Sequence, residues 1–285
     1  MTEVPFGQRL YAAMQEHGPL CVGIDPHPGL LKDAGLGDTP AGMERFAQTI
    51  LEAVGGQVAA IKPQSAFFER HGSAGIAVLE RLLRDCVAAG TLSILDVKRG
   101  DIGSTMTAYA QAYLVDGAPL AADAVTLSPF LGFGSLRPGL DSAEAHGRGV
   151  FVLALTSNPE GASVQQHGSP PVATRIIEDV AAENHKSGSV PGAPGHVGLV
   201  IGATHADALH ELGMLAQIRD SGAIVLAPGV GAQGATGGDL AEAFAGFTDH
   251  VLAPVSRGVL GQGFGVGDIH SASAALNDEL RECLQ

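Results

Sequence analysis

The chain has 285 residues, of which 45% are hydrophobic, and its formal net charge at pH 7 is -14. This length suits one large α/β domain or two smaller ones. The acidic charge is spread along the chain, which excludes nucleic acid and anionic membranes as main partners, because both require clusters of Lys and Arg. A small anionic substrate is still allowed, since a site can be locally positive on an acidic protein.

Isolated cysteines and an acidic N-terminal segment indicate a cytoplasmic location. Cys21, Cys86 and Cys283 form no close pair, which argues against a disulfide framework and against a thiolate metal site. Residues 1–20 contain acids and are predicted to form a short amphipathic helix, unlike a signal peptide. Every apolar run is too short to span a bilayer. We therefore expect a cytoplasmic protein with no membrane segment.

Eight short apolar runs recur along the chain after the N-terminal segment, and each ends in a polar or small residue. Runs that are apolar on successive residues are typical of strands covered on both faces, as in parallel sheets packed against helices. The predicted strands comprise residues 20–25, 57–63, 91–98, 123–129, 149–157, 196–204, 223–229 and 250–256.

Segments with helical spacing separate these strands, and they comprise residues 41–54, 73–89, 104–116, 135–146, 171–187, 206–221, 239–247 and 270–284. Strand and helix alternating in a chain of this size are the pattern of a (β/α)8 or TIM barrel, for which about 250 residues is typical. An open doubly wound sheet is the alternative, but it usually has fewer strands. We expect residues 1–285 to form a single α/β domain, with an insertion loop at the Gly-, Pro- and Ser-rich residues 187–195.

The active site of such a barrel lies at the carboxyl ends of the strands, so the residues that close each predicted strand are candidate site residues. These strand ends carry Asp25, Lys62, Asp96, Lys98, Thr156, Ser157, Pro228, Gly229, Ser256 and Arg257. The pattern predicts a charged site at one end of the barrel.

The segment ILDVKRGDIGST concentrates charge where the third predicted strand ends. Side chains two apart on a strand share a face, so Asp96 and Lys98 are expected to point together into the barrel. Neighbouring carboxylates would keep a buried lysine charged. Asp101 is expected at the start of the next helix, with Thr105 one turn further on the same face. The alternative, an ordinary surface ion pair or helix cap, is disfavoured by so dense a pattern at a buried strand end.

The segment LAPGVGAQGATGG contains the pattern G-x-G-x-x-G, which suggests a dinucleotide site. That fingerprint should open a helix directly in an early strand–helix–strand unit, whereas here the predicted helix begins only near Asp239. A glycine-rich loop after the seventh strand and Arg257 after the eighth match the phosphate site of many barrels instead. Backbone N–H groups and a guanidinium both bind phosphate oxygens. The alternative is a glycine-rich turn beside a solvated arginine.

Motifs for metal or nucleophilic chemistry are missing from the sequence. The eleven histidines are scattered and form neither H-x-H nor H-E-x-x-H. The sequence also contains no S-x-x-K and no G-x-S-x-G. No metal site is predicted.

Taken together, the motifs resemble the orotidine 5'-phosphate decarboxylase family, and specifically its longer bacterial branch. The resemblance extends over residues 20–260 and rests on VGID, IKPQSAFFERHG, LDVKRGDIGST, TSNP, APGVGAQG and SRG. It implies a homodimeric (β/α)8 barrel that converts orotidine 5'-monophosphate to UMP and CO2 in de novo pyrimidine synthesis. It also implies that the reaction needs neither a metal nor an organic cofactor.

The resemblance further implies a role for each matching residue. Lys98 would protonate C6 as CO2 leaves, and Asp96 would sit against the departing carboxylate. Asp101 and Thr105 would contribute to the active site of the partner subunit. The substrate contacts implied are Asp25 and Lys62 to the ribose, Ser157 or Thr156 to the pyrimidine, and Gln233 and Arg257 to the phosphate, with Pro228 in the same set. The loop around Gln233 would close as a lid.

Physical reasoning supports a fixed cation in this site. Loss of CO2 from C6 leaves an electron pair that no carbonyl is placed to delocalise simply, so a preorganised ammonium group in a dry site would lower the barrier. A metal-dependent sugar-phosphate decarboxylase or aldolase is one alternative, but Lys62 would repel its cation. A Schiff-base aldolase would need a neutral Lys98, which the carboxylates oppose. In a non-catalytic phosphate-binding barrel, the buried charges would serve no purpose.

Overall fold

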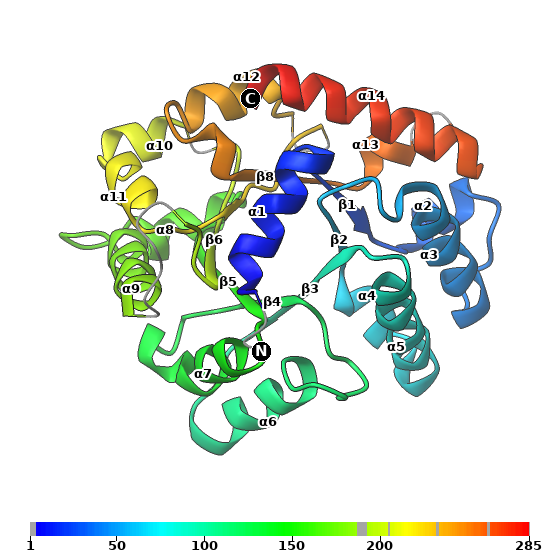
Figure 1. Cartoon of the computed structure of the whole chain (residues 1–285), viewed down its shortest axis with the longest axis horizontal. Helices are drawn as coiled ribbons and strands as arrows, with labels where there is room; N and C mark the ends of the chain where they lie inside the picture. Colours follow the sequence, from blue (N-terminus) through cyan, green and yellow to red (C-terminus); the bar gives the residue numbers. More distant parts are fainter. Residues whose placement is uncertain (1–3, 187–192, 205, 232–233, 261–262, 285) are drawn as a thin grey trace.

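The computed structural model describes residues 4–186, 193–204, 206–231, 234–260 and 263–284. Within these ranges the chain forms a closed barrel of parallel strands in the order β1 to β8, and β8 pairs back to β1. The strands are β1 (Leu20–Ile24), β2 (Ala60–Pro63), β3 (Leu92–Arg99), β4 (Ala124–Leu127), β5 (Gly149–Leu155), β6 (Val197–Ile201), β7 (Val225–Leu226) and β8 (Val251–Val255). The predicted single (β/α)8 barrel is confirmed (Figure 1).

An outer layer of helices surrounds the strands, as Figure 1 shows. The longer helices are α3 (Pro40–Val54), α5 (Gly72–Ala88), α6 (Gly103–Tyr113), α7 (Arg137–Ala145), α9 (Val172–Lys186) and α14 (Val266–Leu284). The shorter ones are α2 (Pro28–Asp33), α4 (Ser65–Glu69), α8 (Ala162–Gln165), α10 (Ala206–Glu211), α11 (Leu215–Asp220), α12 (Gly237–Ala243) and α13 (Arg257–Leu260). Turns of 3-10 helix are η1 (Phe133–Leu136), η2 (Pro159–Gly161) and η3 (Thr248–His250). Among the described helices, none combines the length and the apolar content needed to cross a membrane.

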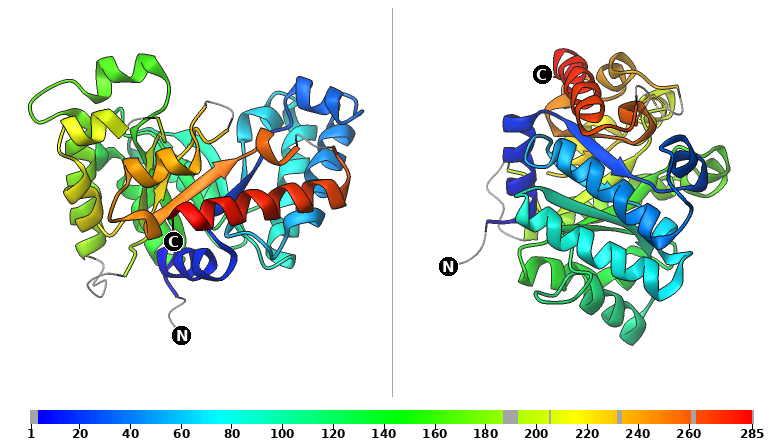
Figure 2. Two further views of the ribbon diagram at one scale, coloured as in Figure 1. Left: turned by 90° about the horizontal axis from the view of Figure 1, so that it is seen from above. Right: turned by 90° about the vertical axis from the view of Figure 1, so that its right-hand side faces the viewer.

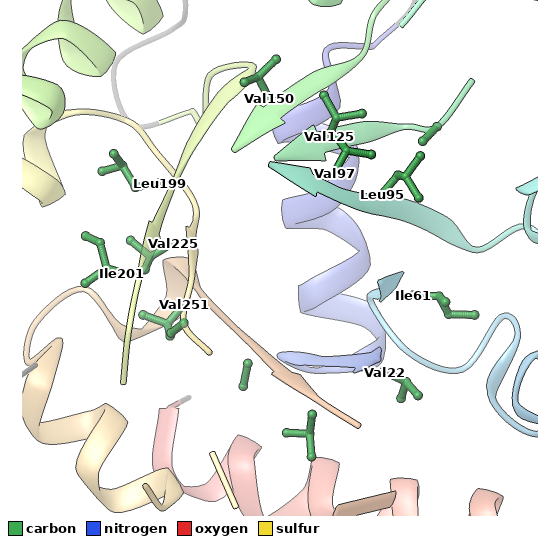
Figure 3. Packing of buried hydrophobic residues seen from close by; sticks show 14 of the residues in the cluster. Val22, Ile61, Leu95, Val97, Val125, Val150, Leu199, Ile201, Val225 and Val251 are labelled. Carbon is green, nitrogen blue, oxygen red and sulfur yellow. The ribbon is translucent and has the colours of Figure 1, made fainter. Parts of the chain in front are cut away.

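Alternation along the strands divides the core into two layers. In β3, Leu95 and Val97 join an outer cluster that fills the space between strands and helices (Figure 3). Ile94 belongs to a second cluster inside the barrel. Because side chains on a strand alternate with a period of two, Asp96 shares the inner side with Ile94. The apolar neighbours thus determine which way the charged residue points.

Helix α1 (Phe6–His17) closes the amino-terminal end of the barrel. Its buried side chains Phe6, Leu10 and Met14 join the inner cluster, and the Phe6 ring meets that of Phe151 edge-on, with centroids 6.1 Å apart. The helix lies across the barrel in Figure 1 and beneath it in the left view of Figure 2. The predicted amphipathic helix is confirmed. With this end plugged, the carboxyl ends of the strands are the natural place for a site.

Some predicted boundaries are wrong. The helix predicted at 206–221 is the pair α10 and α11, because Gly213 adopts a φ of 64° and its N–H donates to the His210 carbonyl in the last turn of α10. The strand predicted at 223–229 is reduced to β7, since the chain turns into the glycine-rich loop after Leu226. The insertion loop predicted at 187–195 lies largely outside the described residues.

Candidate active site

A cavity of about 600 Å³ opens at the carboxyl ends of the strands. Residues predicted from the strand ends line it, namely Lys62, Asp96, Lys98, Thr156, Ser157 and Pro228. They come from β2, β3, β5 and β7 or from the residues just after these strands. The parallel strands therefore gather polar groups from distant parts of the sequence into one site.

Asp96 lies at the centre of the charged group. Its side chain is 8% exposed, and Lys98 Nζ lies 2.6 Å from each of its carboxylate oxygens. Lys62 Nζ lies 3.4 Å from Asp96 Oδ2, and Gln64 Nε2 donates to the same oxygen at 3.0 Å. Thr126 Oγ1 donates to Asp96 Oδ1 at 2.7 Å. Two ammonium groups and two neutral donors thus surround one buried carboxylate.

Electrostatics keep Asp96 and Lys62 ionised. Burial favours a higher pKa for Asp96, but the charges of Lys62 and Lys98 and the hydrogen bonds from Lys98 and Thr126 outweigh it, so that its pKa is about 2. Burial likewise opposes the charge of Lys62, yet Asp25 and Asp96 together raise the pKa of Lys62 above its ordinary value. Asp96 and Lys62 are therefore charged at neutral pH.

Lys98 reaches Asp96 through a turn of the backbone and not through regular strand alternation. Its φ is 45°, and no other non-glycine residue in the described ranges has a positive φ. The pairing of β3 with β4 shifts in register between Leu95 and Arg99. Lys98 and Asp96 are therefore in contact, as predicted, but the contact arises from this turn and the predicted cause, regular strand alternation, is wrong. The Lys98 side chain is also 47% exposed, less enclosed than expected.

Asp25 follows β1 and lies near Lys62. It is half-buried, and its Oδ1 is fully buried without a hydrogen-bond partner among the described residues. Its charge is one of the causes that raise the pKa of Lys62. A buried acceptor without a donor is destabilising, and Asp25 is not among the residues that line the cavity.

Asp101 and Thr105 are not among the residues that line the cavity. Asp101 accepts a hydrogen bond from the Ile102 N–H at 2.8 Å. The prediction that Asp101 starts the helix is wrong, because α6 begins at Gly103 and Asp101 precedes its N-cap. Thr105 is exposed in the first turn of α6. Within the described part of this single chain, no hydrogen bond or ion pair joins Asp101 to Lys98.

The end of β5 presents two hydroxyls with different surroundings. Thr156 Oγ1 accepts from Gln165 Nε2 at 2.7 Å and donates to Asn158 Oδ1 at 2.7 Å, while its N–H donates to Gln165 Oε1 at 2.8 Å. Ser157 lines the cavity, and its hydroxyl forms no hydrogen bond with the described residues. Ser157 is therefore the hydroxyl left for a ligand.

The glycine-rich loop after β7 does not form a dinucleotide fingerprint. Its glycines have positive φ values of 131° at Gly229, 72° at Gly231 and 90° at Gly234. The next helix, α12, begins only at Gly237. The last glycine of the pattern, Gly234, therefore precedes the helix and does not open it, which argues against a dinucleotide site. Arg257 is exposed at the start of α13, and Gln233 lies outside the described residues.

The two neutral residues that donate to Asp96, Gln64 and Thr126, are absent from the sequence prediction. Gln64 stands two residues after Lys62, so continued alternation beyond the second strand is a signal that could have identified it. Thr126 is a hydroxyl residue in the otherwise apolar β4 and is 2% exposed. A buried polar side chain in a short apolar strand is itself unusual and needs a partner.

No group of three or more His, Cys, Asp or Glu side chains in the described ranges could hold a metal ion. At Asp96, a divalent cation would have to displace or approach two ammonium groups, which Coulomb repulsion opposes. The barrel and this cluster define the chain as a (β/α)8-barrel enzyme whose site centres on a carboxylate held between lysines.

Comparison with known proteins defines the family. The model of the orotidine 5'-phosphate decarboxylase / HUMPS family matches residues 18–267, and the chain belongs to this family. The orotidine 5'-phosphate decarboxylase of Salinispora arenicola is 52% identical over 281 residues, which cover 98% of this chain and 96% of the relative. The corresponding protein of Streptomyces coelicolor is 50% identical over 281 residues, covering 97% of each chain.

Solved structures agree with this assignment. A crystal structure described as an orotidine 5'-phosphate decarboxylase of Streptomyces avermitilis has a TM-score of 0.91 and 49% identity, and the match covers 100% of this chain and 97% of that one. The Leishmania donovani OMP decarboxylase has a TM-score of 0.76 and 30% identity, covering 98% of this chain and 99% of that one. The predicted family is therefore confirmed, whereas its longer bacterial branch stays a prediction.

Proposed function

We propose that this protein is a carboxy-lyase that converts orotidine 5'-monophosphate to UMP and CO2 in pyrimidine biosynthesis. The observation that carries the proposal is the Lys62–Asp96–Lys98 cluster at the carboxyl end of the barrel, in a chain about half identical to relatives named for this activity. The cluster offers a fixed ammonium group at the edge of a cavity, which is what the reaction requires.

The proposed reaction needs no cofactor. The bond between C6 and the carboxylate breaks, CO2 leaves, and the electron pair stays on C6. Lys98 then gives a proton from its ammonium group to C6, and the neutral amine regains a proton from solvent. Asp96, ionised at neutral pH because its pKa is about 2, holds this ammonium group in position through contacts of 2.6 Å before the substrate arrives.

The remaining predicted contacts fit around this step. Ser157 is the better candidate for the pyrimidine, because the Thr156 hydroxyl already bonds to Gln165 and Asn158. Asp25 is half-buried at the end of β1, and its carboxylate would accept a hydrogen bond from a ribose hydroxyl. Lys62 would bind the ribose beside Asp25, and Pro228 would contact the ligand from the end of β7.

We assign phosphate binding to Gln233, Arg257 and the glycine-rich loop that follows β7. Arg257 is exposed at the start of α13, so its guanidinium is accessible to a ligand. The N–H groups of Gly231 and Gly234 already donate within the loop, to the carbonyl oxygens of Ala235 and Gly231, so the Arg257 guanidinium is the described group that carries this assignment. Phosphate contacts far from C6 would supply binding energy that closes the loop around Gln233 as a lid.

We also propose a homodimer in which Asp101 and Thr105 contribute to the partner's site. Ile102, which follows Asp101 in the chain, is 62% exposed in the single chain, and Phe130, which lines the cavity, is 78% exposed. Exposed apolar groups next to a charged cavity are typical of a surface that a partner covers. Such a partner would also enclose Lys98, which is half-exposed in the single chain.

A cytoplasmic location remains our expectation. Cys21, Cys86 and Cys283 are free thiols. Burial raises the pKa of both Cys21 and Cys86 to about 12, so that both are poor nucleophiles. Free, unreactive thiols suit a reducing compartment.

The proposal is tested by incubating purified protein with orotidine 5'-monophosphate in excess chelator and measuring UMP by chromatography. We expect full turnover in chelator and a loss of about 10³-fold in kcat for Lys98→Ala, because the proton donor is gone. Arg84→Ala, which removes an exposed ion pair with Glu80, is the control and should keep wild-type activity. Inhibition by the chelator, or an active Lys98→Ala, would overturn the mechanism.

A further inference from the structure

Thr126 connects the backbone of Lys98 to the carboxylate of Asp96. Thr126 lies in β4 and is 2% exposed. Its Oγ1 accepts a hydrogen bond from the Lys98 N–H at 2.9 Å and donates one to Asp96 Oδ1 at 2.7 Å. One hydroxyl from the neighbouring strand therefore contacts both members of the ion pair.

The direction of these two hydrogen bonds is determined by chemistry. A backbone N–H can only donate, so the Lys98 N–H uses a lone pair of the Thr126 oxygen. An ionised carboxylate can only accept, so the single hydroxyl proton must go to Asp96. The hydroxyl has no second arrangement that satisfies both neighbours, and β-branching restricts its χ1 rotamer.

Lys98 needs such support because its backbone is unusual. A φ of 45° lies in the left-handed region, which L-residues other than glycine adopt rarely and at a cost in free energy. The strand pairing is irregular at the same place, between Leu95 and Arg99, so the ladder supports the turn poorly. The hydrogen bond from the Lys98 N–H to Thr126 lies within this irregular segment. It is this turn that directs the ammonium group back onto Asp96.

We infer that Thr126 is a positioning residue for the decarboxylation proposed above: its hydroxyl holds the Lys98 turn and the Asp96 carboxylate in one fixed arrangement. The inference rests on the proposed function. Gln64 supports only the other oxygen of Asp96, Oδ2, and it does not contact the Lys98 backbone in the described structure. Without the Thr126 hydroxyl, the Asp96 carboxylate and the Lys98 turn lose their common anchor, and the ammonium group moves away from C6.

The test compares Thr126→Val, which keeps the shape and removes the hydroxyl, with Thr126→Ser, which keeps the hydroxyl. Thr174→Val is the matched control, because Thr174 is also buried and its Oγ1 has no hydrogen-bond partner among the described residues. The measurements are the single-turnover rate with orotidine 5'-monophosphate, the dissociation constant of UMP, and the midpoint of thermal unfolding. The rate reports on the position of Lys98, whereas UMP affinity reports on the rest of the site.

We expect Thr126→Val to lower the single-turnover rate by about 100-fold, as misplacement of a reacting group by about 1 Å does. UMP affinity should change by less than about threefold, because ground-state contacts are retained. Thr126→Ser should recover most of the rate, and Thr174→Val should match the wild type. If Thr126→Val does not fold, Thr126→Ala replaces it, with the same expected loss.

A wild-type rate in Thr126→Val overturns the inference, and so does an equal loss in Thr126→Ser. Parallel losses of rate, UMP affinity and thermal midpoint in Thr126→Val also overturn it, since they would indicate general disruption of the barrel. A wild-type protein that does not decarboxylate orotidine 5'-monophosphate contradicts the proposed function instead, and the two failures are therefore distinguishable.

Discussion

The amine of Lys98 lies 2.6 Å from both carboxylate oxygens of Asp96, although the two residues stand only two positions apart on β3. On a regular strand, residues two apart are separated by about 7 Å along the chain and their side chains run side by side. The left-handed turn at Lys98 replaces this separation with a direct contact. A short ion pair at the strand end is therefore produced by the backbone and by the hydroxyl of Thr126 from β4.

Replacing Asp96 with asparagine should destabilise the protein most at neutral pH. The pKa of Asp96 is about 2 in the folded protein, against an ordinary value of 3.8. Its ionised form therefore adds stability that is fully present above the ordinary value and is lost as the pH falls through about 2. At about 1.36 kcal/mol per pH unit, the separation of these values corresponds to about 2 kcal/mol.

Urea unfolding of the wild type and Asp96→Asn at several pH values measures this effect. The difference in free energy of unfolding should be largest near pH 7 and should narrow as the pH falls below about 4. Asp220→Asn, which changes a carboxylate that is 69% exposed, is the control and should change the free energy of unfolding by no more than about 0.5 kcal/mol. A difference between the wild type and Asp96→Asn that stays constant with pH would contradict the assignment.

The same cluster shows how far the sequence predicts the site. Alternation within one strand is local, so the inward direction of Asp96 could be predicted from ILDVK alone. The turn at Lys98 could not, because it depends on a hydrogen bond to Thr126, a residue 28 positions away in the chain. The proposed role of Asp101 is still harder to predict from one sequence, because it depends on a second copy of the chain.

In the rest of the fold, too, features set by local sequence could be predicted, whereas features set by packing could not. The eight strands could be predicted because buried parallel strands are apolar on successive residues. The sequence pattern does not predict the break between α10 and α11, because Gly213 occurs within an otherwise helical pattern and a helix can tolerate a single glycine. Only the packed structure shows that this glycine ends a helix.

Truncating Glu183 should reduce stability without affecting catalysis. Glu183 on α9 receives two hydrogen bonds from Arg137 on α7, at 2.6 Å and 2.7 Å, and its side chain is 5% exposed. Glu183→Ala removes these two charge-assisted hydrogen bonds, while Arg137, which is 40% exposed, keeps its ion pair with Asp141, so we expect a loss of about 2 kcal/mol in the free energy of unfolding. Chemical denaturation measures the loss, and kcat should be unchanged at temperatures where the variant is folded.

The exposed pair of Arg84 and Glu80 provides the comparison for this prediction. These side chains are 63% and 37% exposed and stand one helical turn apart. Arg84→Ala should cost no more than about 0.5 kcal/mol, because exposed ion pairs on a helix contribute little. Equal losses in the two variants would mean that burial does not strengthen the Arg137–Glu183 pair.

A shared active site predicts that two inactive variants restore activity when they are mixed. Lys98→Ala lacks the proton donor, and Asp101→Ala lacks the carboxylate that we propose to reach the partner's site. In a hybrid dimer, one site receives both intact residues and the other receives neither. Random exchange of equal amounts makes half of the dimers hybrids, so about one quarter of the wild-type sites are regenerated.

The mixed sample is assayed for UMP formation after subunit exchange has been verified with differently tagged chains. Activity near a quarter of the wild-type value supports a site completed by Asp101 across the interface. Each variant mixed with itself is the control and should stay inactive, because no arrangement of identical subunits then yields an intact site. If exchange is complete and the mixed sample stays as inactive as its parents, Asp101 acts within its own subunit. The exposed Ile102 and Phe130 would then need another explanation than the proposed dimer contact.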